Sequence, residues 1–143
     1  MMKRTTKLVI AVTLVLAMLF CIVSCGEKKT EEGLWASALY TENTTLGEGS
    51  KTITVEVTAE EKTVVFTVKT DADTVGAALL EQNLIAGDEG PYGIYIKTVN
   101  GMLADFDVDQ TYWSFTIAGE TAMTGADQTE ITDGTVYGFV RTK

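Results

Sequence analysis

The chain has 143 residues, of which 45% are apolar and 22% charged, so it corresponds to about one domain and is neither collagen-like nor disordered. Acidic residues outnumber basic ones by 20 to 11, which gives a net charge of −9. Because such a surface repels phosphate backbones, we expect no nucleic-acid partner. The sequence contains no histidine, which excludes imidazole acid–base chemistry and imidazole metal ligands.

Residues 1–24 have the pattern of a lipoprotein signal peptide. Basic residues at positions 3, 4 and 7 precede an apolar run over 8–23, which is shorter than the roughly 20 residues of a membrane-spanning helix. Without these three positive charges, the net charge of −9 becomes −12 for the rest of the chain. The run ends in Ile22-Val23-Ser24-Cys25, which resembles the lipobox of bacterial lipoproteins.

The lipobox resemblance implies that the chain is cut before Cys25 and that this cysteine receives a diacylglyceryl group. Two acyl chains anchor a protein stably, so we expect export and attachment to the outer face of the cell membrane through the lipid on Cys25. The alternative is an apolar segment that stays uncut and acts as a short membrane anchor.

Residues 25–50 are predicted to form the lipidated cysteine, a tether and an edge strand. The stretch 26–33 is polar and charged and has no apolar periodicity, which is typical of a tether. Leu34 to Thr41 is the candidate edge strand, whereas Thr44 to Gly49 is typical of a loop. The folded domain is predicted over 51–143.

Two alternating runs predict a β-hairpin at the start of this domain. Apolar residues recur with period two over 52–58 and again over 64–69, and Ala59 to Lys62 form the polar connection. Thr70 to Asp73 then give a helix-start signal in which Asp73 is the expected N-cap. The helical spacing from Val75 to Gln82 predicts a short helix that ends at Asn83 or Gly87.

Several strands follow the helix. They are predicted over 94–99, 102–104, 112–117, 120–123 and 135–141, with an acidic loop over 106–111. Asn100-Gly101 is the dipeptide favoured in type I′ hairpin turns. One helix on one face of a mixed or antiparallel sheet is an α+β, β-grasp-like arrangement. The predicted shared core consists of Phe66, Val68, Leu79, Phe115 and Ile117.

Four segments resemble the transcobalamin-like C-terminal domain family. They are TDADTVG at 70–76, GIYIKTVNG at 93–101, YWSFTI at 112–117, and Gly125 with ITDG at 131–134. Together they extend over most of 52–143, and the Tyr-Trp strand with the later Asp-Gly turn is the most specific part. The usual Asn-Gly after the Tyr-Trp strand is Ala118-Gly119 here, which departs from the family pattern.

The resemblance implies a β-grasp-like fold and a corrinoid ligand. In the animal cobalamin carriers of this family, the tryptophan of the Tyr-Trp strand and the two residues after it contact the ligand. By position these are Trp113, Ser114 and Phe115, with Tyr112 beside them. Strand alternation supports a second interpretation, in which Trp113 and Phe115 are core residues on the face of Ile117.

Exposed aromatic side chains can mark a binding patch. The sequence predicts partly exposed aromatic residues at Trp35, Tyr92, Tyr95 and Tyr112. The alternative is the ordinary aromatic content of a β-sheet.

The run Asp105-x-Asp107-x-Asp109 is the candidate metal site. An EF-hand loop needs Gly at its sixth position and Glu at its twelfth, which are Gln110 and Thr116 here. This run is therefore no EF-hand, and weak Ca²⁺ binding or a solvated turn remain as interpretations.

Catalysis without histidine would have to use carboxylates, Lys, Ser or Thr. For glycoside hydrolysis, the candidate carboxylate pair is Asp105 with Asp127 or Asp133. A domain of this size offers little cleft for a sugar chain, so we predict that the protein is not an enzyme and has no cofactor. The leading hypothesis is a lipid-anchored binding module for a small molecule, with a corrinoid as the first candidate. The alternative is a display or adhesion domain that contacts proteins or cell-wall components through a free strand edge.

Overall fold

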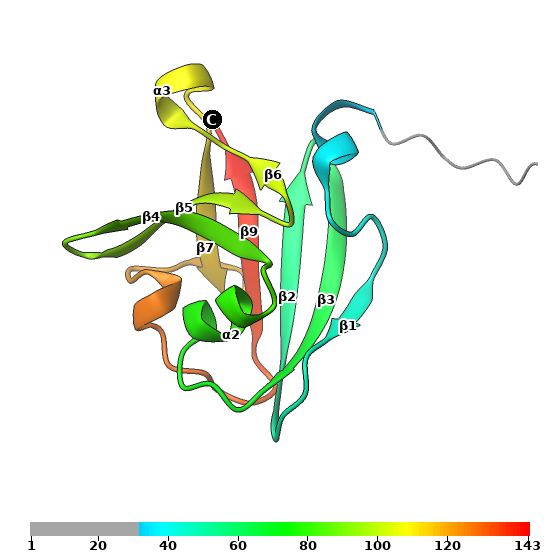
Figure 1. Ribbon diagram of the computed structural model, residues 1–143, viewed down its shortest axis with the longest axis vertical. Coiled ribbons are helices and arrows are strands. Elements are labelled where there is room, and N and C mark those ends of the chain that lie inside the picture. Colours follow the sequence, from blue (N-terminus) through cyan, green and yellow to red (C-terminus); the bar gives the residue numbers. More distant parts are fainter. Residues whose placement is uncertain (1–31) are drawn as a thin grey trace, which may run out of the picture. The chain divides into compact units, whose positions relative to one another are not determined.

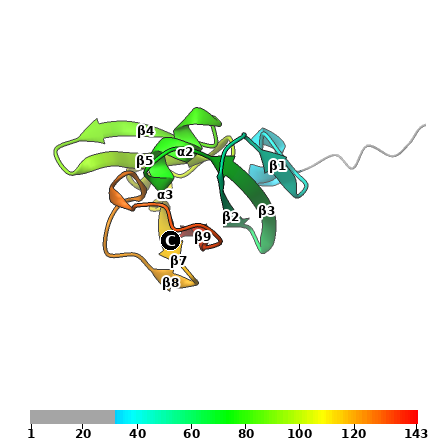
Figure 2. The ribbon, with the colours of Figure 1, turned by 90° about the horizontal axis from the view of Figure 1, so that it is seen from below.

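The computed structural model describes residues 32–143, shown as ribbons in Figures 1 and 2. The predicted signal peptide, Cys25 and most of the tether lie outside the described residues. No helix within 32–143 is long and apolar enough to cross a membrane. The described elements are η2 (Gly33–Ser37), β1 (Thr44–Leu46), β2 (Lys51–Ala59), β3 (Lys62–Thr70), α2 (Val75–Glu81), β4 (Ile85–Gly90), β5 (Gly93–Val99), β6 (Met102–Leu103), α3 (Phe106–Asp109), β7 (Tyr112–Ile117), β8 (Glu120–Thr121), η3 (Ala126–Gln128) and β9 (Val136–Thr142).

The strands form two sheets, whereas the sequence predicted one. The larger sheet has the order β1-β3-β2-β9-β7-β8 and is mixed, because β1 runs parallel to β3 and β9 runs parallel to β2. The smaller sheet, β4-β5-β6, is antiparallel. Strands in two sheets with a few short helices agree with the predicted α+β class.

The β2–β3 hairpin confirms the clearest sequence prediction. Its nine pairs run from Lys51 opposite Thr70 to Ala59 opposite Lys62, so the connecting turn is Glu60-Glu61. Both glutamates have positive φ, 49° and 64°, as a two-residue type I′ turn requires. The alternation places one apolar row of each strand in the core: Ile53, Val55, Val57, Val64, Phe66 and Val68.

The strand β4 was missed by the sequence analysis. Its sequence, IAGDEG, has two glycines, two acids and no period-two apolar pattern, and only Ile85 in it is buried. It forms with β5 a hairpin around Pro91-Tyr92 that extends beyond the other described elements in both ribbon views. The strand β4 forms because it pairs with β5. The local sequence of β4 does not show this pairing partner.

The helix α2 ends where the sequence predicted, since Asn83 follows its C-cap with φ 54°. Its N-cap is Thr74 rather than Asp73. The Thr74 hydroxyl accepts a hydrogen bond from the Ala77 backbone N–H at 3.2 Å, whereas the Asp73 carbonyl accepts one from the Ile131 N–H at 2.9 Å. The helix starts at Val75 as the spacing predicted, but its N-cap lies one residue later than Asp73.

The predicted edge strand over 34–41 is wrong. This segment begins with the 3-10 helix η2, and the edge strand is β1, within the stretch predicted as a loop. Trp35 also differs from its prediction of partial exposure, because it is buried and its indole N–H donates to the Ala59 carbonyl at 2.9 Å. Because the indole packs at the end of β2, the chain around Trp35 forms a tight turn instead of an extended strand.

The predicted core is confirmed for Phe66, Val68 and Leu79, which are fully buried. Phe115 and Ile117 are only partly buried and pack against the edge of the core. The sequence also predicted Phe106 to Thr111 as a loop, of which 106–109 form the one-turn helix α3.

Candidate functional site

An apolar cleft of about 170 Å³ opens between β5 and β7 and contains most of the predicted ligand-binding residues. Five of its nine lining residues are aromatic, and we call it the aromatic cleft. Its lining residues are Ile94, Tyr95, Ile96, Tyr112, Trp113, Phe115, Gly125, Ala126 and Phe139.

Trp113 fixes the distance between the two walls of the aromatic cleft. Its indole N–H donates to the carbonyls of Lys97, at the end of β5, and Met102, in β6, at 3.1 and 3.2 Å. This side chain on β7 therefore ties the larger sheet to the smaller one. Because Trp113 is 7% exposed, most of its ring belongs to the core and only its edge is left for a ligand.

Phe115 forms part of an aromatic stack on the same side of β7. Its ring lies 5.2 Å from that of Phe139 and 6.1 Å from that of Tyr137, at interplanar angles of 30° and 14°. Phe115 is half-buried, whereas Phe139 and Tyr137 are fully buried. Trp113 and Phe115 therefore pack against the core, as one interpretation of the sequence predicted. They also line the aromatic cleft, where the other interpretation places a ligand.

Ser114 is separated from this aromatic surface. It is not among the residues that line the aromatic cleft, and it pairs with Val140 on the face of β7 opposite Trp113 and Phe115. Three consecutive strand residues cannot all point to one side. Of the four predicted ligand residues, the structure brings together Tyr112, Trp113 and Phe115.

Three tyrosines near the aromatic cleft are exposed, as the sequence predicted. Tyr95 and Tyr112 line the cleft itself and are 48% and 40% exposed. Tyr92 lies at the hairpin tip, where 90–95 line a second hollow of about 260 Å³. The two hollows share Ile94 and Tyr95, so the surface continues from the cleft along the hairpin.

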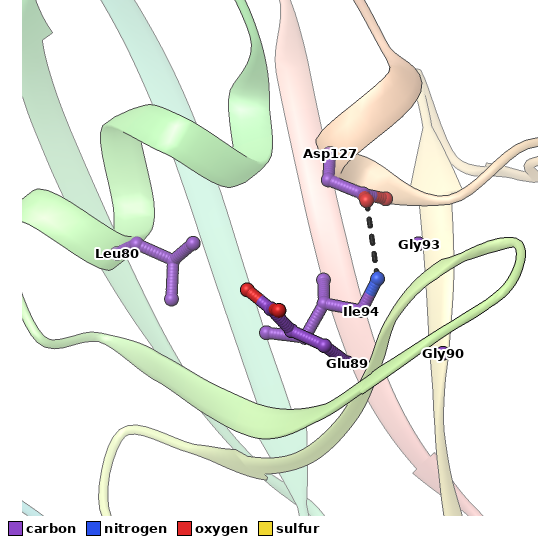
Figure 3. Close-up of a pocket in the computed structure, with 6 residues that line it drawn as sticks. All are labelled: Leu80, Glu89, Gly90, Gly93, Ile94 and Asp127. Carbon is purple, nitrogen blue, oxygen red and sulfur yellow. Dashed lines mark hydrogen bonds between the residues drawn. The ribbon is translucent and has the colours of Figure 1, made fainter.

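A third hollow, also of about 260 Å³, shares Ile94 with the first two and is shown in Figure 3. We call it the acidic hollow because it contains the carboxylates of Glu89 and Asp127. Asp127 Oδ2 accepts a hydrogen bond from the Ile94 backbone N–H at 3.1 Å. The sequence analysis considered Asp127 only for catalysis and missed Glu89.

Two aspartates of the D-x-D-x-D run, Asp105 and Asp109, have structural partners of their own. Asp105 caps α3 by accepting a hydrogen bond from the Asp107 N–H at 3.1 Å. Asp109 accepts from the backbone and hydroxyl of Thr111 and forms an ion pair with Arg141 at 2.9 Å. The Thr111 hydrogen bonds, followed by the Arg141 charge, hold the pKa of Asp109 below its ordinary value.

These three carboxylates do not converge on one point. Within 32–143, no group of three or more Cys, Asp or Glu side chains is arranged to hold a metal ion. The candidate catalytic aspartates also bind different backbone groups, because Asp133 accepts a hydrogen bond from the Thr52 N–H at 2.6 Å, whereas Asp127 accepts one from the Ile94 N–H.

Comparison with solved structures places the chain in a family. The crystal structure of a "putative metal binding protein" from Ruminococcus gnavus ATCC 29149 is 38% identical, with a TM-score of 0.63, over 66% of this chain and 98% of that chain. The chain belongs to the family of that protein. A family model described as a domain of unknown function, DUF4430, matches residues 72–136, which include both strands that line the aromatic cleft.

The family fold also occurs within a larger protein. Haptocorrin in complex with Cbi is 22% identical over 68% of this chain, with a TM-score of 0.50, and this likeness shows a shared fold. The matched region is 26% of the haptocorrin chain. No curated protein matches the sequence.

Proposed function

We propose that this protein is an exported, lipid-anchored and non-catalytic binding module that holds a small molecule with an extended ring system in its aromatic cleft. The observation that carries the proposal is the cleft itself, where exposed Tyr95 and Tyr112 flank the edges of Trp113 and Phe115. The proposal includes a β-grasp-like core, in which α2 packs near β4 and η3. This core holds β5 beside β7.

A corrinoid is the ligand class we propose. Haptocorrin, which shares the fold, is described in complex with Cbi, and the β7 sequence matches the Tyr-Trp strand to which the family resemblance assigns ligand contact. Because the chain has no histidine, contact with the ligand must come from ring packing and hydrogen bonds rather than from imidazole ligation of cobalt. The planar faces of Tyr and Trp favour stacking on such a ring system.

The size of the aromatic cleft limits the affinity. A volume of about 170 Å³ holds roughly one aromatic ring, so the cleft covers only part of a macrocycle. Well-formed pockets bury about 70–90% of a ligand. We therefore expect a dissociation constant in the micromolar range, which corresponds to about −8 kcal/mol.

Calorimetric titration of the full chain in phosphatidylcholine nanodiscs with cobinamide tests this function. Tyr95→Ala is expected to weaken binding by about tenfold, because it removes an exposed aromatic wall without opening the core. Phe106→Ala removes an equally exposed aromatic residue outside the cleft and is expected to leave the affinity unchanged. Absence of heat at about 300 µM ligand would reject corrinoid capture.

The lipid anchor is tested separately. In a bacterial host fed with labelled palmitate, the wild-type chain is expected to carry label and to fractionate with membranes. Cys25→Ala removes the only thiol at the predicted lipidation position, so it should accumulate as an unlabelled, uncut precursor, while Cys21→Ala should behave like the wild type. Label on the Cys25→Ala variant would contradict the proposed anchor.

A display or adhesion function is the second candidate, and the β4 edge favours it. β4 is the outer strand of the smaller sheet, and its residues after Ile85 are exposed. An extended partner can add a strand to such an edge. This function is expected to survive Tyr95→Ala, which separates it from capture in the aromatic cleft.

A further inference from the structure

The acidic hollow is built from three segments that are far apart in the sequence. Leu80 comes from α2, Glu89 to Ile94 come from the β4–β5 hairpin, and Asp127 comes from η3. Figure 3 shows the Glu89 carboxylate pointing from the hairpin towards Leu80, and the Asp127 carboxylate beside the Ile94 nitrogen. The hollow therefore has an aliphatic wall and two carboxylates.

Asp127 is held in place by three glycines that lie against it. A Cβ on Gly93 would lie 2.2 Å from Asp127 Oδ2, one on Gly125 would lie 2.8 Å from Oδ1, and one on Gly76 would lie 2.5 Å from the Asp127 Cα. Only glycine at these positions leaves room for the aspartate. The hydrogen bond from Ile94 fixes the carboxylate further.

The negative charge of the acidic hollow is poorly compensated. Asp127 Oδ1 is inaccessible to solvent and accepts no hydrogen bond from the described residues, although a carboxylate can accept about four. The Glu89 side chain forms no hydrogen bond or ion pair within the described part of the chain, and none of the residues that line the hollow is basic. Lys97 pairs instead with Asp88 at 2.8 Å, and that contact raises the pKa of Lys97.

We propose that the acidic hollow binds an alkylammonium group, such as a lysine side chain or another aliphatic amine. The methylene stem would lie along Leu80 and Ile94, and the ammonium would lie between the carboxylates of Glu89 and Asp127. The net charge of −9 adds a long-range attraction for such a cation. This site is distinct from the aromatic cleft. It would give the surface around Ile94 a second kind of ligand, an organic cation.

A divalent metal fits the acidic hollow less well. Calcium takes six to eight oxygen ligands. The hollow offers only two carboxylates, and its remaining wall includes the aliphatic side chains of Leu80 and Ile94. An organic cation uses both the charge and the apolar wall.

Ligand-observed saturation-transfer NMR on the full chain in phosphatidylcholine nanodiscs tests the site, with empty nanodiscs as the blank. The probe is Nα-acetyl-lysine N-methylamide, and its Nε-acetylated form is the neutral control. We expect saturable binding of the charged probe in the millimolar range and none of the acetylated form. Glu89→Gln and Asp127→Asn should each weaken binding by about tenfold, since each removes one charge-assisted contact.

Asp88→Asn is the matched control, because it removes the same charge from the neighbouring position of β4 on the face that pairs with Lys97. It and Tyr95→Ala should leave the dissociation constant unchanged, which separates this site from the aromatic cleft. Glu89 is exposed, so its glutamine variant keeps the fold even if Asp127→Asn does not. Equal binding of both probes, equal effects of Glu89→Gln and Asp88→Asn, or specific displacement by calcium would each overturn the proposal.

Discussion

Phe139→Ala is expected to destabilise the domain by about 3–5 kcal/mol, because it empties a fully buried site beneath the aromatic cleft. That loss is a large share of the roughly 5–15 kcal/mol by which domains are stable. The Phe139 ring also supports Phe115 at 5.2 Å, so its removal opens the floor of the cleft. Chemical denaturation followed by circular dichroism measures the change in unfolding free energy.

Phe115→Ala is the control for this experiment. Phe115 lines the same cleft but is only half-buried, so its truncation should cost clearly less than that of Phe139. A larger loss at Phe115 than at Phe139 would contradict the burial assigned to these two paired rings.

Asn100→Ala is expected to cost about 2–4 kcal/mol, although the side chain is small. Asn100 is fully buried and has φ 51°, a conformation that alanine adopts with strain. Its amide accepts from the Tyr40 N–H at 2.9 Å and donates to the Tyr40 carbonyl at 2.8 Å. Both Tyr40 groups would lose their partners. Thermal unfolding should show a correspondingly lower Tm.

Asn83 offers a matched comparison within the chain. It has nearly the same backbone conformation, φ 54°, but it is exposed and its side chain makes no hydrogen bond within 32–143. Asn83→Ala therefore measures the backbone strain alone. If both alanine variants lose the same stability, the Asn100–Tyr40 hydrogen bonds contribute nothing and the expected result is contradicted.

Local patterns predicted the elements that depend on local chemistry. The β2–β3 hairpin and β7 follow from period-two alternation of β-branched and aromatic residues, and Asn100-Gly101 adopts the expected turn with φ 51° and 77°. β4 and the burial of Trp35 could not be predicted in this way. Both depend on partners elsewhere in the chain, namely β5 and the Ala59 carbonyl.

The candidate site was predicted only on its β7 side. Tyr112, Trp113 and Phe115 follow from the strand pattern together with the family resemblance, and alternation separates Ser114 from Trp113 and Phe115. The β5 wall could not be predicted, because β5 and β7 belong to different sheets and no hydrogen-bond register links them. Their proximity is set by the Trp113 indole, which donates to carbonyls of the smaller sheet.

A crystal structure of the protein with bound cobinamide tests the central claim most directly. The account predicts the corrin ring against the aromatic cleft, in contact with Tyr95 and Tyr112 and with the edges of Trp113 and Phe115, while Ser114 on the opposite face makes no contact. A ligand bound on the Ser114 face, or elsewhere with the aromatic cleft free, would contradict it.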